Sequence, residues 1–402
     1  MFNLNFYNKA LMYILYFMST YNLLFVKLFQ SLSSNNYFSD EIIKLFRKNT
    51  NNVYYNDDVI DKETLSYVIK KYNITLENEK PINSGMIAIV YKGRINDTNA
   101  DVIIKIKKKN IKKCLEKSYN EFINIYNFLS FALTPFHCSN FLLLFKSLTE
   151  TKEYILDQVN FENEINNIKT TFLEMKNVSN NIIIPTVLND NDDIINTNFI
   201  LMNYIDGINL YQLDENNKLS YLKILLEYCL PQPFLLTYIH SDLHPGNIIY
   251  MNVDGELKIG IIDFGMVIKS NCKNKKNMIN ILNYIYKDEI DSNEDILSLS
   301  NELLFSPIID VTKLQQIDID NLNIILKEFF MYIKKGNLNE TNCYNSIELI
   351  KKITKVDCNL DKQAVHLLLS FTMINASLNY LSSYDQKVLE KYMEVVFNDL
   401  LN

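Results

Sequence analysis

Residues 239–265 of the chain read IHSDLHPGNIIYMNVDGELKIGIIDFG, and the polar residues within them decide which fold the sequence predicts. The stretch opens with His240, Asp242 and Asn247 in the spacing H-x-D-x-x-x-x-N. The tripeptide Asp-Phe-Gly follows at residues 263–265, so that its aspartate stands sixteen residues after the asparagine. Two polar motifs in this order and at this separation are the strongest functional signal in the chain.

These residue types suit phosphoryl transfer from ATP, which needs positioning and charge neutralisation rather than covalent help from the protein. Asp242 is placed to act as a catalytic residue that orients or deprotonates an attacking oxygen. Asn247 and Asp263 are hard oxygen ligands, which suit Mg²⁺ ions that bridge phosphates. The alternative is a buried loop in which Asp-Phe-Gly occurs by chance, and the order and spacing of the two motifs argue against it.

The residues between the two motifs predict a β-hairpin. Residues 248–250 and 258–262 form short apolar runs, and Asp254-Gly255 between them is a dipeptide typical of hairpin turns. Such a hairpin brings Asn247 and Asp263 to the same end of a sheet. The two predicted metal ligands are therefore expected to lie close together.

Length, composition and charge limit the classes of protein to which the chain can belong. It has 402 residues, 48% of them apolar and 22% charged, which is typical of a globular protein large enough for two lobes. The net charge of −7 argues against nucleic acid as a partner. The six cysteines form no C-x-x-C pair, which argues against a zinc site and favours a reducing compartment.

The N-terminal residues predict helices. Residues 10–29 are strongly apolar, but four polar residues interrupt them, namely Ser19, Thr20, Asn22 and Lys27. A membrane-spanning helix needs about 20 mostly apolar residues, so a buried helical hairpin is the better interpretation. An amphipathic helix is expected over residues 40–48. Neither a signal peptide nor an Arg-rich transit peptide is recognisable in the sequence.

A nucleotide-covering loop and a strand that carries a lysine are expected next. Residues 81–92 read as strand, small-residue turn and strand, with Ser84 and Gly85 in the turn, where glycine lets the backbone approach phosphates. The apolar run at 102–106 carries Lys105, which we expect to contact the α- and β-phosphates. A lysine in V-x-x-K is a weak signal in a lysine-rich chain, but its order before the Asp242 motif favours this role.

The carboxylate that would pair with Lys105 is expected within residues 111–180, which read as helices. Glu164 is the candidate. The alternative is that Glu164 is a surface glutamate like its neighbour Glu162. Because the two glutamates stand so close together, the sequence leaves this alternative open.

A second hairpin is predicted by the apolar runs at 182–188 and 198–204. Its second strand ends in the turn MNYIDG at 202–207, where a kinase hinge would hold adenine through backbone hydrogen bonds. Met202 and Tyr204 are therefore the candidate adenine-binding residues. Beyond the Asp-Phe-Gly motif the sequence reads as helical to its end.

Together these motifs resemble those of the UbiB-type atypical kinases, the aarF-domain proteins linked to ubiquinone biosynthesis. The resemblance covers roughly residues 20–300 and rests on HSDLHPGN at 240–247, the small-residue loop after Pro81, VIIK at 102–105, the Glu164 helix and KLFQ at 27–30. It implies an α+β, two-lobed protein-kinase-like fold with a helical N-terminal extension and an all-helical C-terminal lobe. The expected boundaries are 1–80 for the extension, 81–205 for the N-lobe and 206–402 for the C-lobe.

One feature separates this family from other kinases: a K-x-G-Q extension that folds over the active site where a protein substrate would dock. The resemblance therefore assigns Lys27 and Gln30 a role at the nucleotide pocket. Residues at positions i and i+3 share one helix face, so both polar groups can point into the cleft. We expect residues 20–48 to pack across the cleft, and such a lid favours a small or lipidic acceptor, or ATP hydrolysis, over a protein acceptor.

The chain departs from the family pattern at several positions. Phe29 replaces the glycine of K-x-G-Q, so helix packing must differ there. Gln158 and Asn160 replace the two acids of an E-x-D pair and lack the charge to hold a cation. An alanine-rich loop of the family becomes NSGM at 83–86. The lysine, the helix glutamate, both aspartates and the asparagine are retained, so the resemblance implies binding of ATP and Mg²⁺.

The sequence leaves three functions open. The leading hypothesis is an atypical kinase or ATPase that acts in quinone or lipid metabolism, with the pathway resting on the resemblance alone. The alternatives are a small-molecule phosphotransferase of the aminoglycoside or choline kinase type, and a catalytically silent scaffold that keeps the fold. The candidate partners are a nucleotide, a lipid or quinone-like small molecule, and a membrane surface in peripheral contact. The resemblance implies a mitochondrial or plastid location.

Overall fold

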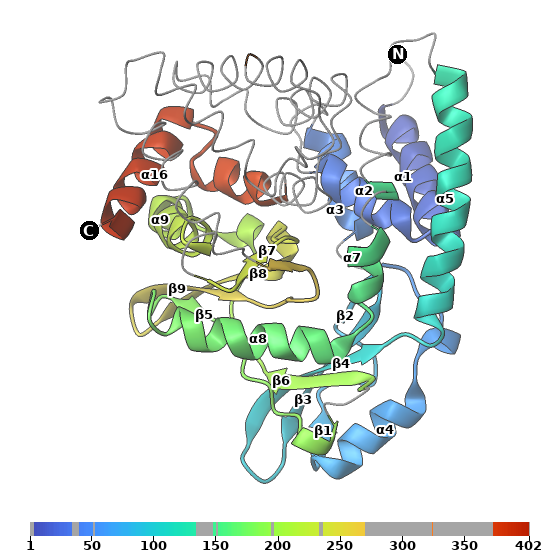
Figure 1. The fold of residues 1–402 in the computed structure, drawn as a ribbon, viewed down its shortest axis with the longest axis horizontal. Helices are drawn as coiled ribbons and strands as arrows, with labels where there is room; N and C mark the ends of the chain where they lie inside the picture. The colour runs from blue at the N-terminus through green and yellow to red at the C-terminus, as the bar shows by residue number, and fades with distance from the viewer. Residues whose placement is uncertain are drawn as a thin grey trace.

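In the computed structural model, a sheet formed within residues 74–203 and a second group of strands lie on either side of helix α8 (Phe161–Met175), as Figure 1 shows. The structure describes residues 4–33, 40–50, 53–133, 148–149, 152–193, 197–232, 236–269, 324 and 373–401. Helices and strands both contribute to the described part, so the α+β class expected from the sequence is confirmed.

The N-terminal sheet has five strands, all paired antiparallel, in the order β1-β3-β4-β6 with β2 beside β3. The strands are β1 (Ile74–Leu76), β2 (Asn83–Ser84), β3 (Ala88–Ile95), β4 (Ala100–Lys107) and β6 (Phe199–Asn203). Side chains alternate across a strand. Ile104 and Ile106 are therefore buried in one core with Val68 of α4 (Lys62–Lys71), and Lys105 points to the opposite face, towards α8.

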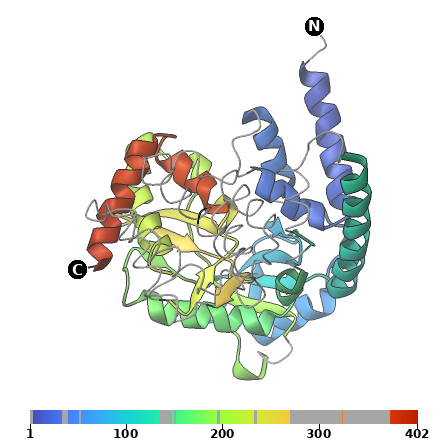
Figure 2. The ribbon, with the colours of Figure 1, turned by 45° about the horizontal axis from the view of Figure 1, so that its top comes forward.

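Helices from the N-terminal part of the chain lie beside the long helix α5, as both ribbon views show (Figures 1 and 2). The N-terminal helices are α1 (Leu4–Tyr21), α2 (Leu24–Ser33) and α3 (Asp40–Thr50). Helix α5 spans Ile111–Leu133, and the short α7 (Lys152–Asp157) packs against it. Asn22 separates α1 from α2, because its side-chain oxygen accepts the N–H of Leu24 and caps α2. Its amide group also donates to the carbonyl of Ser118 on α5. The polar interruption in residues 10–29 thus marks a helix boundary.

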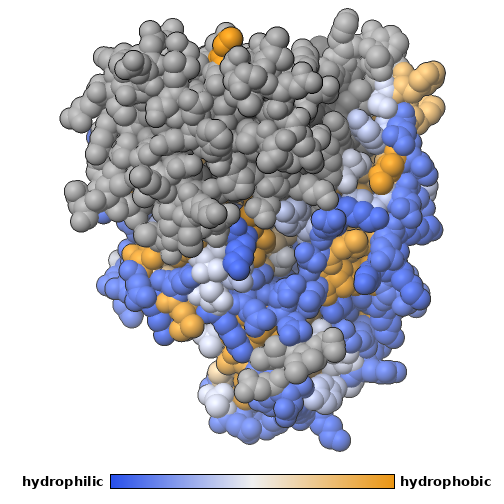
Figure 3. All heavy atoms as spheres, viewed as in Figure 1, coloured by the Kyte–Doolittle hydropathy of each residue, from blue (hydrophilic) through white to orange (hydrophobic). Residues whose placement is uncertain are grey.

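Two helices, α1 and α2, occupy the residues for which a buried helical hairpin was predicted, but α1 is only partly buried. Tyr13 and Phe17 on its outer face are 75% and 66% exposed. No helix in the described part of the chain is both long and apolar enough to cross a membrane. On the face drawn in Figure 3, hydrophilic residues predominate over the described part, and hydrophobic residues form small separate groups.

The second group of strands carries the motifs of residues 239–265. A three-stranded sheet contains β5 (Ile182–Ile183), β9 (Glu256–Ile261) and β8 (Ile248–Val253), and β7 (Tyr238–His240) pairs with β10 (Val267–Lys269). Asp254 and Gly255 between β8 and β9 have φ angles of 54° and 89°, values that a two-residue hairpin turn requires. The hairpin predicted from this dipeptide is therefore confirmed.

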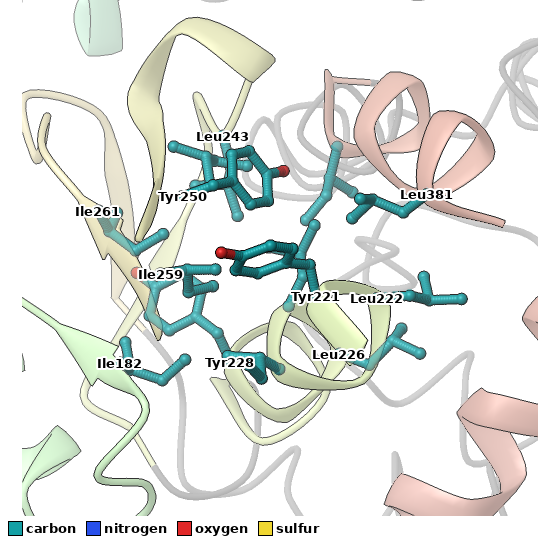
Figure 4. Close-up of a cluster of buried hydrophobic side chains, with 14 of the residues drawn as sticks. Ile182, Tyr221, Leu222, Leu226, Tyr228, Leu243, Tyr250, Ile259, Ile261 and Leu381 are labelled. Carbon is teal, nitrogen blue, oxygen red and sulfur yellow. The ribbon is translucent and has the colours of Figure 1, made fainter. Parts of the chain in front are cut away.

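A hydrophobic core holds this hairpin against the neighbouring helices (Figure 4). Tyr250 of β8 meets Tyr221 of α9 (Lys218–Cys229) edge to face, with ring centroids 5.1 Å apart. Leu381, in the helix at 373–381, is fully buried in the same core. The strands that carry the motifs are thus supported by residues close to the end of the chain.

Two expectations about strands need correction. Residues 182–188 and 198–204 do not form a hairpin, because β5 pairs in parallel with β9 in the second sheet. The two segments are joined instead by an isolated antiparallel bridge between Val187 and Met202 and by hydrogen bonds beside it. In addition, β1 precedes the expected boundary at residue 81 and yet belongs to the N-terminal sheet. The three domain boundaries remain a prediction.

The C-terminal lobe is not all-helical as expected, since β7 to β10 lie within residues 206–269. Of these, β8 and β9 follow from the apolar runs on both sides of Asp254-Gly255, which have the strand length and turn of a hairpin. The helix expected near the end of the chain is present as α16 (Gln386–Leu401). Most of the expected helical part, residues 270–323 and 325–372, lies outside the described residues.

We expect Phe29→Ala to lower the free energy of unfolding by about 3–5 kcal/mol, because it deletes a buried ring from the core. Phe29 is 3% exposed and stacks on Phe25 and Phe46 with ring centroids 5.9 and 5.4 Å away. Chemical unfolding followed by circular dichroism measures the loss. Phe131→Ala is the control, since Phe131 is 85% exposed. Equal losses in the two variants would contradict the packing of α2 described above.

Candidate active site

A cavity of about 520 Å³ opens between the N-terminal sheet, α2 and the strands that carry the Asp242 motif. Ten of the predicted site residues line it: Lys27, Gln30, Gly85, Lys105, Glu164, Met202, Tyr204, Asp242, Asn247 and Asp263. Ser84 does not line it, because alternation along β2 turns the Ser84 side chain into the protein and exposes Asn83. The hydroxyl of Ser84 is therefore not available to a nucleotide in this cavity.

Lys105 joins three separate elements of the fold. Its Nζ lies 2.6 Å from Oε1 of Glu164 and 3.1 Å from Oδ2 of Asp263. β4 supplies the lysine, α8 supplies the glutamate, and the loop after β9 supplies the aspartate. Among the described residues Glu162 forms no ion pair, so the structure distinguishes the two glutamates that the sequence left open.

Burial and charge act in opposite directions on the pKa values of this ion-paired group. Burial lowers the pKa of Lys105, but the charges of Asp263 and Glu164 outweigh it and raise that pKa above its ordinary value. Burial raises the pKa of Glu164 more than Lys105 lowers it. The pKa of Asp263 is held below its ordinary value, since Lys105 and the N–H of Gly265 outweigh burial. Asp263 is therefore a charged carboxylate at neutral pH.

Lys27 of α2 reaches the second aspartate of the site. Its ammonium group forms an ion pair with Oδ2 of Asp242, and the two side chains are only 7% and 12% exposed. Burial raises the pKa of Asp242, but Lys27 and then His244 outweigh it and hold that pKa below its ordinary value. A helix from the N-terminal part of the chain thus neutralises the aspartate that the sequence singled out as catalytic.

Hydrogen bonds fix the backbone on both sides of Asp242. Nδ1 of His240 accepts the N–H of Asp242 at 3.2 Å, which leaves the ring proton on Nε2 to be donated to the carbonyl of Asp263. Nδ2 of Asn247 donates to the carbonyl of Asp242 at 2.8 Å. The first motif and the Asp-Phe-Gly motif are therefore tied together through backbone atoms.

The oxygen atoms of Asn247 and Asp263 suit a magnesium ion. Because Nδ2 of Asn247 is held by the protein, its Oδ1 is the atom left for a ligand. Asp263 accepts the N–H of Gly265 with Oδ1 at 2.9 Å and Lys105 with Oδ2. Within the described ranges no group of three His, Cys, Asp or Glu residues could hold a metal ion. Two hard oxygen ligands fit Mg²⁺, which keeps water and phosphate oxygens as its other ligands.

The predicted hinge residues lie at the cavity, but their amides are already bonded. Tyr204 donates its backbone N–H to the carbonyl of Asp101 at 3.0 Å. Met202 still lies inside the ladder between β4 and β6 and forms a bridge on its other side. Ile205 also lines the cavity, and its N–H has no hydrogen-bond partner in the described part of the chain. The sequence pattern identified a segment that lines the cavity but not the residue with a free amide, and its role as a hinge remains a prediction.

The departures from the family pattern have local explanations. Asn160 caps α8, since its Oδ1 accepts the N–H of Glu162 at 3.1 Å, and an asparagine before a helix is a recognised cap signal. Gln158 is buried and lines the cavity. Phe29 fills the core beneath α2. Asn160 and Phe29 thus have structural roles of their own.

His244 is a cavity residue that the sequence analysis did not single out. It stands between Asp242 and Asn247 in the quoted motif, so its place in the motif was the available signal. Nδ1 of His244 accepts the N–H of Gly246 at 3.1 Å. Burial lowers the pKa of His244 more than the neighbouring Asp242 raises it, so the ring is neutral at pH 7.

Comparison with known proteins agrees with the motifs. Residues 56–295 match the family model described as ABC1 atypical kinase-like domain. The chain is 26% identical over 238 residues to Protein ACTIVITY OF BC1 COMPLEX KINASE 1, chloroplastic, of Arabidopsis thaliana, with 56% of this chain and 31% of that protein covered. It is 25% identical over 221 residues to Probable protein kinase UbiB of Tolumonas auensis, with 52% and 39% covered. The chain therefore spans only about three to four tenths of the length of these two relatives.

Solved structures of low identity also align with the chain. The Rio2 kinase–ADP/Mg²⁺–phosphoaspartate complex from Chaetomium thermophilum gives a TM-score of 0.32 at 11% identity, with 83% of this chain and 94% of that chain covered. Aminoglycoside phosphotransferase APH(4)-Ia gives a TM-score of 0.29 at 9% identity, with 78% and 99% covered.

We expect Lys27→Met to lower the free energy of unfolding at pH 7 by about 3–5 kcal/mol, because it leaves the buried carboxylate of Asp242 without a counterion. The double variant Lys27→Met/Asp242→Asn removes that charge and should recover most of the loss. Chemical unfolding of the two single variants and the double variant measures the coupling. Additive losses in the double variant would contradict the buried ion pair.

Proposed function

We propose that this chain, which belongs to the ABC1 atypical kinase-like family, binds ATP together with Mg²⁺ and acts as an atypical kinase or ATPase. The observation that supports the proposal is the convergence of Lys105, Glu164, Asp263, Asn247 and Asp242 on one cavity. These are the residue types that phosphoryl transfer needs, and each is held by contacts of its own.

Each residue has a role in this proposal. Lys105, oriented by Glu164, binds the α- and β-phosphates. Asn247 and Asp263 hold Mg²⁺, which when bound supplies charge neutralisation of the phosphates. Asp242 orients the attacking oxygen or accepts its proton. The Ile205 amide, rather than that of Met202 or Tyr204, is the donor left for adenine.

Lys27 limits which acceptors suit this site. Because its ammonium occupies Oδ2 of Asp242, an acceptor must bind beside α2 or displace Lys27. A bulky protein acceptor fits poorly under a helix, whereas water or a small or lipidic molecule does not need an open cleft. We therefore favour ATP hydrolysis or transfer to a lipid or quinone-like molecule over protein phosphorylation.

The two alternative functions are less well supported. A small-molecule phosphotransferase of the aminoglycoside or choline kinase type would be expected to leave the space beside Asp242 open, whereas α2 closes it. A catalytically silent scaffold would have no need of the Lys105 ion pairs or of the free oxygen of Asn247.

We extend the proposal to a peripheral membrane contact and an organellar location. Exposed aromatic residues on α1 and α5 support the membrane contact, namely Tyr13, Phe17, Tyr21, Phe128 and Phe131. Aromatic rings of this kind suit the boundary between water and lipid. Two Arabidopsis relatives are named as chloroplastic, which supports a plastid or mitochondrial location for this chain.

We expect ADP or ATP to raise the melting temperature only when Mg²⁺ is present, and Asp263→Asn to abolish this effect because it removes a charged metal ligand. At a ligand concentration about 100 times Kd the stabilisation is about 2.7 kcal/mol. Thermal-shift titrations with Mg²⁺ and with a chelator measure it. Asp254→Asn in the exposed hairpin turn is the control. Undiminished stabilisation of Asp263→Asn would contradict the metal assignment.

We expect Glu164→Gln to lower the rate of phosphate release from ATP by at least about tenfold, since the lysine loses the charge that orients it. Glu162→Gln, on the same helix turn, should retain the rate of the unaltered chain. A phosphate-release assay at saturating Mg²⁺ compares the two variants. If Glu162 proved to be the sensitive position, the role assigned to Glu164 would be wrong.

A further inference from the structure

Lys108 forms hydrogen bonds to the loop at residues 85–88, which lines one side of the cavity. Its Nζ donates to the carbonyl of Gly85 at 2.8 Å, and its backbone N–H donates to the carbonyl of Ile87 at 2.9 Å. The turn is closed by a bond from the N–H of Gly85 to the carbonyl of Ala88 at 2.9 Å. Gly85, Ile87 and Ala88 line the cavity, whereas Lys108 does not. Lys108 therefore binds this loop from outside the cavity lining.

The hydrogen bond from Lys108 fixes the orientation of the peptide group between Gly85 and Met86. The C=O and N–H of a trans peptide point in opposite directions, and the described residues contain no cis peptide. Because Lys108 holds the Gly85 carbonyl, the N–H of Met86 must point away from Lys108. That N–H has no hydrogen-bond partner among the residues that the structure describes, and Met86 lines the cavity. A free amide on a loop that lines the cavity suits a phosphate oxygen.

Packing alone does not explain a lysine at this position. Lys108 is 7% exposed, and within the described ranges no carboxylate pairs with it. Burial lowers the pKa of Lys108 to about 8. A buried ammonium with one carbonyl acceptor stabilises a fold less than an apolar side chain of similar volume. The neighbouring Lys109 is exposed, so the chain does not lack a surface position for this charge.

We propose that Lys108 is a positioning residue for nucleotide binding, which turns the Gly85–Met86 peptide so that the Met86 N–H donates to a phosphate of ATP. The inference rests on the proposed function, since it requires that the cavity binds ATP. In this proposal Lys105, within β4, contacts the phosphates directly. Lys108, which directly follows β4, affects them only indirectly, by orienting the loop that carries the Met86 N–H. The ligand moiety that Lys108 recognises indirectly is the polyphosphate and not the nucleoside.

The test compares ligands with and without phosphates in the same variants. Lys108→Met is expected to weaken binding of Mg·ATP about tenfold, because the charge-assisted bond that orients the loop is lost. Binding of adenosine should change by less than about twofold, since adenosine makes no phosphate contact. Lys108→Gln keeps a neutral hydrogen-bond donor, so its affinity for Mg·ATP should lie between that of the unaltered chain and that of Lys108→Met. Lys109→Met is the matched control for the loss of one positive charge.

Calorimetric titration measures these affinities, and thermal unfolding without ligand checks the fold. Equal losses for Mg·ATP and adenosine would overturn the proposal, because they would indicate a general disturbance of the pocket. Unchanged Mg·ATP affinity in Lys108→Met would overturn it as well. If Lys108→Met does not fold, the ratio of affinities in Lys108→Gln decides by the same rule. If the unaltered chain binds neither ATP nor ADP, the proposed function is wrong, and the role proposed for Lys108 is wrong as well.

Discussion

The ion pairs of Lys105 with Glu164 and Asp263 are the interaction on which the candidate site depends. They connect β4, α8 and the loop after β9, elements that come from distant parts of the chain. A buried ion pair adds little to stability compared with apolar packing, but breaking it leaves an uncompensated charge. The arrangement is therefore better suited to fixing three groups relative to one another than to stabilising the fold.

The second buried ion pair, between Lys27 and Asp242, depends on packing for its stability. Two charges that leave water need compensation, and the apolar face of α2 provides it through Leu24, Leu28 and Phe29, all of which are buried. Packing in this core explains why a phenylalanine is accommodated at position 29, where the family pattern has glycine. The helix is held by its own core, and the lysine is carried to the aspartate as a consequence.

Local signals in the sequence were sufficient for some features and not for others. The Asp254-Gly255 turn specifies its hairpin through backbone conformation alone, whereas the motifs made Glu164 a candidate partner of Lys105 without separating it from Glu162. The partner of Lys27 lies 215 residues away, and nothing in the local sequence specifies it. Short strands such as β5 carry too few residues to select a neighbour, which is why the hairpin predicted for 182–188 and 198–204 is wrong.

The charges that meet in the cavity explain why a nucleotide would need its metal. Lys27 and Lys105 contribute two positive charges, and Asp242, Asp263 and Glu164 contribute up to three negative ones, so these groups together carry no positive excess. A polyphosphate brings several further negative charges into a partly buried space, where they interact more strongly than in water. In the proposed function, Mg²⁺ held by Asn247 and Asp263 would offset them. The same balance makes a free amide on the covering loop useful, since a neutral donor binds a phosphate oxygen without altering the ion pairs beneath it.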